Sequence, residues 1–346
     1  MKISYSKYLL ELKHQFTISY NSRKSTPIVL IKIEHDGFIG YGEASLPPYL
    51  QETQESVINF LKLISQINFD NISNYRIILN EVDQVLENNT AAKAAVDIAL
   101  HDLLGKINKK PCHQLFHITT NSSLPSTSFT IGIDKEEILK QKISEAEEYQ
   151  IFKVKLGTTN DKQIIQSIRE KTNKPLYVDI NQGWSDKYFA LEMSEWLYGQ
   201  NVLLIEQPFP KNDLEKSAWL SKRSPIPIIA DESVQRFSDV EKIKNSFNGI
   251  NIKLMKCTGM NEAYKMIVKA RENDLKVMIG CMTETSCGIC AAVQFSSLVD
   301  YADLDGNLLI TNDPFEAVTI VDGRLHLSEK DGLGITLKAN LPFFEL

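Results

Sequence analysis

The sequence is poor in cysteine, has no long apolar run and carries no excess of basic residues. Its five cysteines among 346 residues are too few for a disulfide framework. No apolar stretch approaches the roughly 18 residues that a membrane-spanning helix needs, and the first residues lack the apolar segment of a signal peptide. The formal net charge of −6 argues against binding of a nucleic-acid backbone. These absences predict a cytoplasmic protein that binds neither nucleic acid nor membrane.

Histidine and cysteine often act in catalysis, but their positions in this sequence do not favour a catalytic role. None of the six histidines falls at the end of a predicted strand, so histidine acid–base catalysis is not expected. Cys287 and Cys290 have CxxC spacing, but no second pair or histidine pair accompanies them. We interpret these two cysteines as helix packing, with a zinc or redox role as the alternative.

The first 125 residues predict an α+β unit. Residues 28–34 form a β-branched apolar run, and residues 38–43 return after an Asp36–Gly37 turn, which is typical of a hairpin. From residue 51 to about residue 106 the apolar spacing becomes helical. Thr90 is expected to cap the clearest helix and Gly105 to end it.

From about residue 126, short apolar runs alternate with amphipathic helical stretches, which predicts parallel βαβ units. A polar residue stands at or just past the end of each run, at a mean interval of about 25 residues. These residues are Thr130, Lys155, Asp179, Glu206, Asp231, Lys253, Cys281 and Asp303. Eight strand ends at one pitch suit a TIM barrel, whose catalytic groups lie at the carboxyl ends of the strands.

Residues 307–346 break this repeat. Residues 318–321 and 324–327 flank Asp322–Gly323 and predict a second hairpin, expected to lie back on the N-terminal unit. The predicted fold class is α/β: a modified TIM barrel, (β/α)7β, over residues 126–306. An α+β capping domain is expected from residues 1–125 together with the returning segment 307–346.

Three carboxylates end successive strands of the predicted barrel. Carboxylates that converge at a barrel mouth repel one another unless a cation joins them. A hard-oxygen set with few protein ligands suits Mg²⁺, which keeps positions for substrate and water. The alternative is that each acid caps the helix after it. We favour one Mg²⁺ site on Asp179, Glu206 and Asp231, with Asn181, Gln207 and Glu232 as supporting residues around it.

Three lysines lie inside apolar strands. Alternation puts Lys153 and Lys155 on one face, inside the barrel, while Val154 packs outward. Two close ammonium groups disfavour each other's charge, so one lysine pKa is expected to fall toward neutrality, as a base requires. Lys253 stands on the strand opposite Lys155. The opposed pair is predicted to take a proton from one face of a carbon and return it to the other. A Schiff-base aldolase also uses a strand lysine, but it needs no such metal site.

Asp303 and Asp305 present two carboxylates on one face at the end of the last barrel strand. No lysine of the set is expected to neutralise them, so they suit a second cation or a substrate amine. Thr130, Cys281 and Met282 stand at the ends of other strands and are expected to line the same pocket.

Taken together, these motifs resemble the enolase superfamily and, within it, the muconate-lactonizing-enzyme-like subgroup. The matching segments are residues 153–155, 179–181, 206–208, 230–233 and 251–253, with 40–44 and 91–97 resembling the capping domain. The resemblance implies one Mg²⁺ on the three carboxylates and Lys155 and Lys253 as the acid/base pair. It also implies that Lys153 binds the substrate carboxylate and lowers the pKa of Lys155. A lysine base beside a Mg²⁺-stabilised ene-diolate is the general pattern of such sites.

Residues 303–306 resemble the dipeptide epimerases of this subgroup, in which paired aspartates hold the α-ammonium group of the substrate. The resemblance implies Mg²⁺-dependent inversion of the second residue of L-Ala-L-Xaa dipeptides by a possible homo-oligomer. Ala-Glu epimerases carry an arginine after the first strand to bind the glutamate side chain, and the matching position here is Asn21. Arg23 and Lys24 are close enough to substitute. We therefore expect a second residue that is not restricted to glutamate.

The alternatives within the subgroup are an L-Ala-D/L-Glu epimerase, an o-succinylbenzoate synthase, a muconate cycloisomerase and an N-acylamino acid racemase. The substrates of the last three have no ammonium group for the paired aspartates. A catalytically silent barrel that serves as a scaffold is the alternative outside enzymes. The presence of all three metal carboxylates and all three lysines argues against it.

Overall fold

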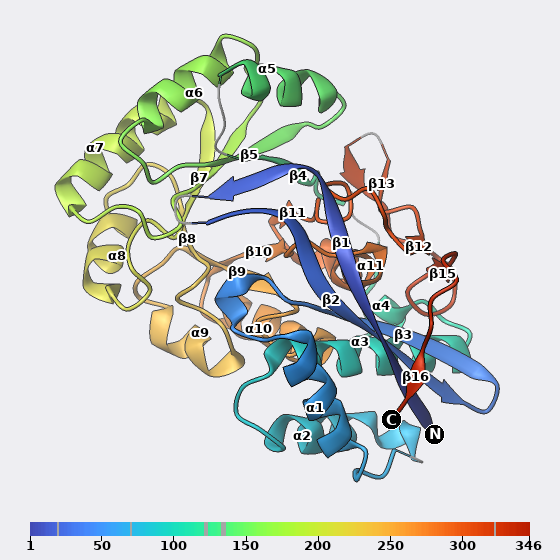
Figure 1. Ribbon diagram of the computed structural model, residues 1–346. Helices are drawn as coiled ribbons and strands as arrows, with labels where there is room; N and C mark the ends of the chain where they lie inside the picture. Colours follow the sequence, from blue (N-terminus) through green and yellow to red (C-terminus); the bar gives the residue numbers. More distant parts are fainter. Residues whose placement is uncertain (19–20, 70, 121–123, 133–135, 322) are drawn as a thin grey trace.

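Two sheets organise the chain (Figure 1). The computed structural model describes residues 1–346 except 19–20, 70, 121–123, 133–135 and 322. One sheet has four strands in the order β16-β1-β2-β3, and the other has eight strands in the order β11-β10-β9-β8-β7-β6-β5-β4. Across the described residues, every helix is too short or too polar to cross a membrane.

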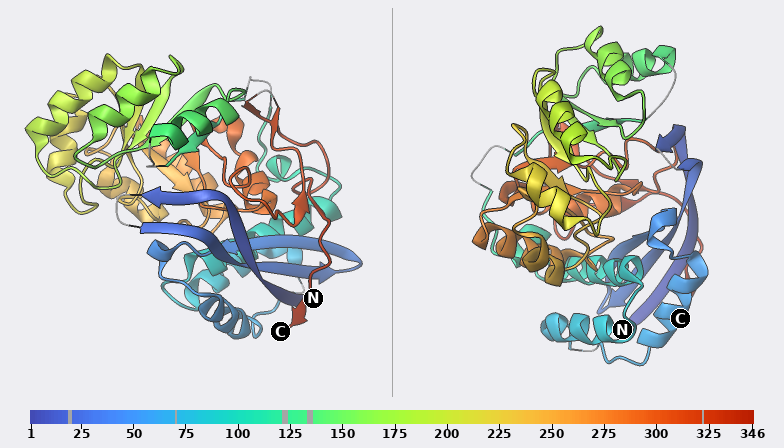
Figure 2. Two further views of the ribbon diagram at one scale, coloured as in Figure 1. Left: turned by 45° about the horizontal axis from the view of Figure 1, so that its top comes forward. Right: turned by 90° about the vertical axis from the view of Figure 1, so that its left-hand side faces the viewer.

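The four-stranded sheet is antiparallel between the long strands β1 (Lys2–Ile18), β2 (Asn21–His35) and β3 (Phe38–Ser45). The apolar run of β2 is buried, as its composition predicts. The Asp36–Gly37 hairpin is confirmed, with φ angles of 49° and 81° at the two turn residues. In Figures 1 and 2 the end of β1 and the start of β2 extend over the barrel.

Helices α1 (Gln54–Ile64), α2 (Tyr75–Gln84), α3 (Thr90–Ile107) and α4 (Cys112–Leu115) follow the first three strands. Helix α3 packs directly against β3, and Gly42 permits the close approach. A Cβ atom on Gly42 would lie 1.9 Å from the carbonyl oxygen of Ala95. Glycine at this position is therefore required by packing between strand and helix.

Both expectations for the ends of α3 are wrong. Thr90 is the first helical residue, and Asn89 precedes it in a left-handed conformation without a side-chain cap. The helix continues through Gly105 to Ile107. Gly105 does not end the helix; it permits a close backbone contact. A Cβ atom there would lie 2.6 Å from the Cα atom of Gly332.

The eight-stranded parallel sheet forms the barrel. Its strands are β4 (Ser128–Ile131), β5 (Ile151–Lys155), β6 (Leu176–Asp179), β7 (Val202–Glu206), β8 (Ile228–Ala230), β9 (Gly249–Lys253), β10 (Lys276–Gly280) and β11 (Tyr301–Asp303). The helices between them are α5 (Glu136–Glu145), α6 (Asp161–Arg169), α7 (Lys187–Tyr198), α8 (Leu214–Ser221), α9 (Phe237–Ile243), α10 (Met260–Glu272) and α11 (Ser286–Val293). A parallel bridge between Thr127 and Ala302 joins the first and last strands.

The eight polar residues at the predicted pitch all lie at or within one residue of a strand end. The predicted fold class is thereby confirmed. Four buried side chains from β6, β7, β8 and β10 form a separate hydrophobic cluster. They are Tyr177, Leu204, Ile229 and Met278.

The C-terminal residues form short strands. Strand β12 (Phe315–Glu316) pairs with β15 (Thr336–Leu337), and β13 (Ile320–Val321) pairs with β14 (Arg324–Leu325). The β13–β14 hairpin hydrogen-bonds the junction before β4, through Leu325 N and Pro125 O at 3.3 Å. It does not join the four-stranded sheet. The last strand, β16 (Phe344–Glu345), does so by pairing with β1.

Two buried carboxylates from the N-terminal unit cap helices of the barrel. Glu43 on β3 accepts hydrogen bonds from Thr285 N at 2.9 Å and Gly288 N at 3.2 Å, at the start of α11. Asp97 on α3 accepts from Met260 N at 2.6 Å, at the start of α10. A carboxylate at a helix N-terminus satisfies unpaired N–H groups and opposes the positive end of the helix dipole. The two units are thus joined by charge and hydrogen bonding as well as by apolar packing.

Candidate active site

Three carboxylates lie side by side at the carboxyl ends of β6, β7 and β8. Strand register pairs Lys155 with Asp179 and Asp179 with Glu206, while Asp231 directly follows β8. Each of the three acids offers a carboxylate oxygen, and these oxygens all lie within 4.8 Å of one another. All three residues are buried. The barrel therefore concentrates negative charge at one point beneath its mouth.

Lysines surround these carboxylates. The Nζ atom of Lys155 lies 2.6 Å from Asp179 Oδ2, and that of Lys253 lies 2.8 Å from Asp231 Oδ2. The two lysines predicted as an acid/base pair thus attach to opposite ends of the carboxylate cluster. This arrangement places one ammonium group on each side of the space above the cluster.

Lys153 lies deeper than the other two, with 1% of its surface exposed. Its Nζ atom is 2.7 Å from Glu206 Oε2, 2.7 Å from Asp303 Oδ2 and 3.5 Å from Asp179 Oδ2. Burial disfavours its charge, but the three carboxylates outweigh burial and hold its pKa well above the ordinary value. At Lys153 the carboxylates thus dominate over the neighbouring ammonium group, and the role of Lys155 as the base of the pair stays a prediction.

The expectation that no lysine neutralises the last-strand aspartates is also wrong for Asp303, which binds Lys153. Ser128 Oγ donates a second hydrogen bond to Asp303 Oδ1 at 2.7 Å. Among the described residues no lysine or arginine forms an ion pair with Asp305, which accepts from Thr130 N at 2.6 Å. Burial and the charge of Asp303 raise the pKa of Asp305 to about 7. An ammonium group of a ligand would relieve this unfavourable charge.

The carboxylate cluster passes a simple test for a divalent cation. Burial and the neighbouring Asp179 raise the pKa of Glu206 to about 7, so this acid lacks sufficient compensating charge. Hard carboxylate oxygens on rigid strand ends are the donor set that suits Mg²⁺. The chemistry of Asp179, Glu206 and Asp231 therefore fits the ion.

A cavity of about 670 Å³, including the open solvent at its mouth, lies above the cluster. The predicted residues that line it are Thr130, Lys153, Lys155, Asn181, Asp231, Glu232, Lys253, Cys281, Met282, Asp303 and Asp305. Asp179, Glu206 and Gln207 lie beneath it, fully buried. The side chain of Asn21 lies outside the described part of the chain; its backbone begins β2 and pairs with Ile18.

The expected supporting residues act in different ways. Asn181 donates its backbone N–H to Asp179 Oδ1 at 2.9 Å. Gln207 Oε1 accepts from Asp231 N at 3.0 Å and so orients the loop that carries this acid. Burial and the charge of Asp231 raise the pKa of Glu232 to about 7. Their roles as supports of a metal site stay predictions.

Several contacts at the site escaped the sequence analysis. Asn251 Nδ2 donates to Glu206 Oε1 at 2.8 Å, and strand alternation could have found it, two residues before Lys253. Lys256 Nζ donates to Asp231 Oδ1 from the turn after β9, where no periodic pattern places it. Arg23 lines the cavity and donates from Nη2 to Thr283 Oγ1 at 3.0 Å, whereas Lys24 is exposed.

Family models match both parts of the chain. Residues 6–116 match the mandelate racemase / muconate lactonizing enzyme N-terminal domain, and residues 137–341 match the enolase C-terminal domain-like model. The chain belongs to the mandelate racemase / muconate lactonizing enzyme family. The resemblance noted in the sequence to this part of the enolase superfamily is confirmed.

Relatives in this family are epimerases and racemases. The L-Ala-D/L-Glu epimerase of Bacteroides thetaiotaomicron is 51% identical over 97% of this chain and 88% of its own length. The L-Ala-D/L-amino acid epimerase of Pedosphaera parvula is 36% identical over 98% of this chain and 100% of its own. The Cytophaga hutchinsonii dipeptide epimerase, solved with Mg and the dipeptide D-Ala-L-Val, superposes with a TM-score of 0.91 at 25% identity, covering 100% and 99% of the two chains.

Proposed function

We propose that this protein is a Mg²⁺-dependent dipeptide epimerase that inverts the α-carbon of the second residue of L-Ala-L-Xaa dipeptides by 1,1-proton transfer. One observation carries the proposal: Lys155 and Lys253 attach to opposite ends of the carboxylate cluster, in the cavity that also contains Asp303 and Asp305. A cavity that contains both ammonium groups and carboxylates complements a zwitterionic dipeptide. The epimerase names of the relatives support the same reaction.

The proton transfer needs one lysine on each face of the α-carbon. In our proposal, one of Lys155 and Lys253 removes the α-proton and the other donates a proton to the opposite face. When bound to Asp179, Glu206 and Asp231, Mg²⁺ supplies positive charge that stabilises the substrate carboxylate as the proton leaves. Lys153 is proposed to add a fixed positive charge beneath that carboxylate. Asp303 and Asp305 would hold the α-ammonium group at the other end.

The side chain of the second residue would meet Arg23. This guanidinium lines the cavity and donates from Nη2 to Thr283 Oγ1 at 3.0 Å. A glutamate side chain would supply a carboxylate of matching geometry. We therefore propose that glutamate is the preferred second residue of the dipeptide and that Arg23 takes the place expected at Asn21. The sequence analysis expected a second residue that is not restricted to glutamate, whereas this proposal favours an acidic second residue.

Deuterium exchange tests the reaction directly. The protein is incubated with L-Ala-L-Glu and Mg²⁺ in D₂O, and proton NMR follows the α-proton of the second residue. We expect this signal to disappear and L-Ala-D-Glu to accumulate. In Lys155→Ala and Lys253→Ala variants, epimerisation should stop, while each variant retains exchange of only one diastereomer. If no dipeptide exchanges its α-proton, the proposal is wrong.

A racemase of N-acylated amino acids is the competing function. A Bacillus cereus N-succinyl-L-Arg/Lys racemase is 31% identical over 95% of this chain and 92% of its own length. Its named substrate is N-acylated and so offers no α-ammonium group to Asp305. Exchange of N-succinyl-L-lysine without exchange of any dipeptide would favour this alternative.

We also propose a cytoplasmic location. All five cysteines are free, and four are buried. Unpaired thiols are usual in a reducing compartment. The protein is taken from a cell lysate without added reductant and treated with a thiol-blocking reagent before or after denaturation. We expect all five thiols to react only in the denatured protein. The homo-oligomer that the resemblance implies stays a prediction.

A further inference from the structure

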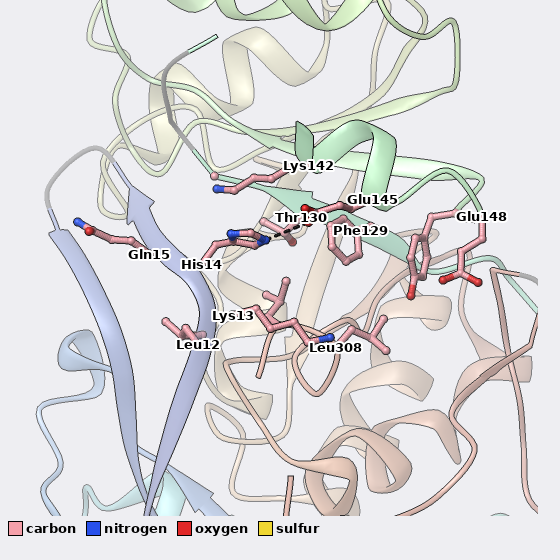
Figure 3. A pocket seen from close by; sticks show the side chains of 13 residues that line it. Leu12, Lys13, His14, Gln15, Phe129, Thr130, Lys142, Glu145, Glu148 and Leu308 are labelled. Atoms are coloured by element: carbon pink, nitrogen blue, oxygen red, sulfur yellow. Dashed lines mark hydrogen bonds and ion pairs between the residues drawn. The ribbon is translucent and has the colours of Figure 1, made fainter. Parts of the chain in front are cut away.

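A second cavity adjoins the proposed active site and is not used by the chemistry above. It measures about 770 Å³ including the open solvent at its mouth. Both cavities are lined by Thr130 and Leu309, so they meet at these two residues. Figure 3 shows residues of β1 on one side and residues of β4 and α5 on the other, facing the same space.

The floor and walls of this cavity are apolar. The rings of Phe129 and Tyr149 stack with their centroids 4.8 Å apart. Leu12 on β1 and Leu308 after β11 complete the apolar lining. A hydrogen bond from Lys13 N to Leu309 O, 2.9 Å long, holds β1 against this wall.

The rim carries charges of both signs. Lys13 and Lys142 are balanced by Glu145 and Glu148. His14 Nε2 lies 3.0 Å from Glu145 Oε2, and this contact connects β1 to α5 across the opening (Figure 3). Because the rim has no charge excess, it would not select a charged side chain over an apolar one of similar size.

The cavity begins beside the proposed ammonium site. Thr130, which lines both cavities, donates its backbone N–H to Asp305 Oδ2 at 2.6 Å. Burial, Glu148 and Asp305 raise the pKa of Tyr149, which lines this cavity, to about 12. The α-carbon of a first residue whose ammonium group binds Asp303 and Asp305 is one bond from that nitrogen. Its side chain therefore has an apolar space within reach.

We propose that this second cavity is the subsite for the side chain of the first residue, and that the protein accepts dipeptides with a large aliphatic or aromatic first residue. The inference rests on the proposed dipeptide epimerase function. Alanine would leave the cavity largely unfilled, whereas leucine or phenylalanine would contact Phe129 and Leu12. Since one added methylene in an apolar pocket changes specificity by about tenfold or more, the larger side chains should bind productively.

The test holds the second residue constant. The kcat/KM values for epimerisation are measured with L-Ala-L-Glu, L-Leu-L-Glu and L-Phe-L-Glu on the Mg²⁺-loaded protein. We expect L-Leu-L-Glu to equal or exceed L-Ala-L-Glu, by up to about tenfold. Turnover of L-Ala-L-Glu with a more than hundredfold lower value for both larger substrates overturns the inference and leaves the proposed function standing. Failure of every dipeptide overturns the proposed function itself.

A pair of variants locates the subsite. Leu12→Trp fills the cavity and should lower the ratio of kcat/KM for L-Leu-L-Glu over L-Ala-L-Glu by at least about tenfold. Leu9→Trp is the matched control, because Leu9 lies on the same strand but is 51% exposed and does not line either cavity. It should leave the ratio unchanged. An equal shift of the ratio in both variants, or no shift in Leu12→Trp, contradicts the assignment.

Discussion

Arg23 offers a sharp test of substrate preference, because its guanidinium lines the cavity from the N-terminal unit while the reacting lysines belong to the barrel. The perturbation is Arg23→Gln, which keeps a hydrogen-bond donor and removes the charge. A hydrogen bond to a charged group contributes about 1.5–3 kcal/mol, which corresponds to about 10–150-fold in a rate or binding constant. The variant should lose this factor in kcat/KM for L-Ala-L-Glu.

The assay compares two substrates on the same protein. L-Ala-L-Gln is nearly isosteric with L-Ala-L-Glu but has no side-chain charge, so its kcat/KM should change by less than about threefold. Lys24→Gln is the matched control, since Lys24 is the next residue but is exposed. It should affect neither substrate. Equal losses on both substrates in Arg23→Gln would show a structural role. A selective loss in Lys24→Gln would show a long-range charge effect. Either result refutes the proposal that Arg23 binds the side chain of the second residue.

Three further outcomes follow from the site and the fold. Lys155→Ala should lower epimerisation of L-Ala-L-Glu by about 10²–10⁴-fold with an unchanged circular dichroism spectrum; undiminished turnover would contradict its role. Gly42→Ala should destabilise the protein by about 1–3 kcal/mol in urea unfolding, because the new Cβ would lie 1.9 Å from a backbone oxygen, whereas Gly199→Ala, whose nearest neighbour would be 3.3 Å away, should stay within about 0.5 kcal/mol. Burial and Glu284 raise the pKa of Glu43 from 4.5 to about 8, so the folded state binds its proton more tightly, and the stability this contributes is lost as pH rises through that window. Glu43→Gln should flatten the fall in melting temperature between about pH 5 and 8, and an equally steep fall in the variant would rule out this acid as the cause.

The barrel could be predicted because each of its signals is local and periodic. Asp179, Glu206 and Asp231 each follow a short apolar run, and parallel strands bring their ends to one edge whatever the intervening helices look like. The alternation of Lys153, Val154 and Lys155 likewise needs only the two-residue period of a strand. Strand-end chemistry in such a fold is therefore accessible to sequence analysis.

Contacts that depend on closure of the barrel could not be predicted. Lys153 reaches Asp303 only because β4 and β11 meet, through a bridge between Thr127 and Ala302, far apart in the sequence. The resulting excess of carboxylates around Lys153 holds its pKa well above the ordinary value, an effect that residue spacing alone does not indicate. The position of Arg23 depends on the register of β1 with β2, which shifts between Glu11 and Phe16. A one-residue change of register exchanges the two faces of a strand, so counting residues from a family position is unreliable there.

The helix-capping carboxylates of the N-terminal unit bear on how such enzymes can be recombined. Arg23, which is proposed to select the side chain, belongs to the same unit as Glu43 and Asp97, which cap α11 and α10 of the barrel. Gly259 reserves the space for Asp97, since a Cβ atom there would lie 2.5 Å from the Cβ atom of Asp97. A chimera that takes its N-terminal unit from another enzyme must therefore carry acids at the positions of Glu43 and Asp97. Its barrel must also keep the glycine at position 259. Modular exchange of specificity is therefore constrained by a few buried hydrogen bonds between the two units.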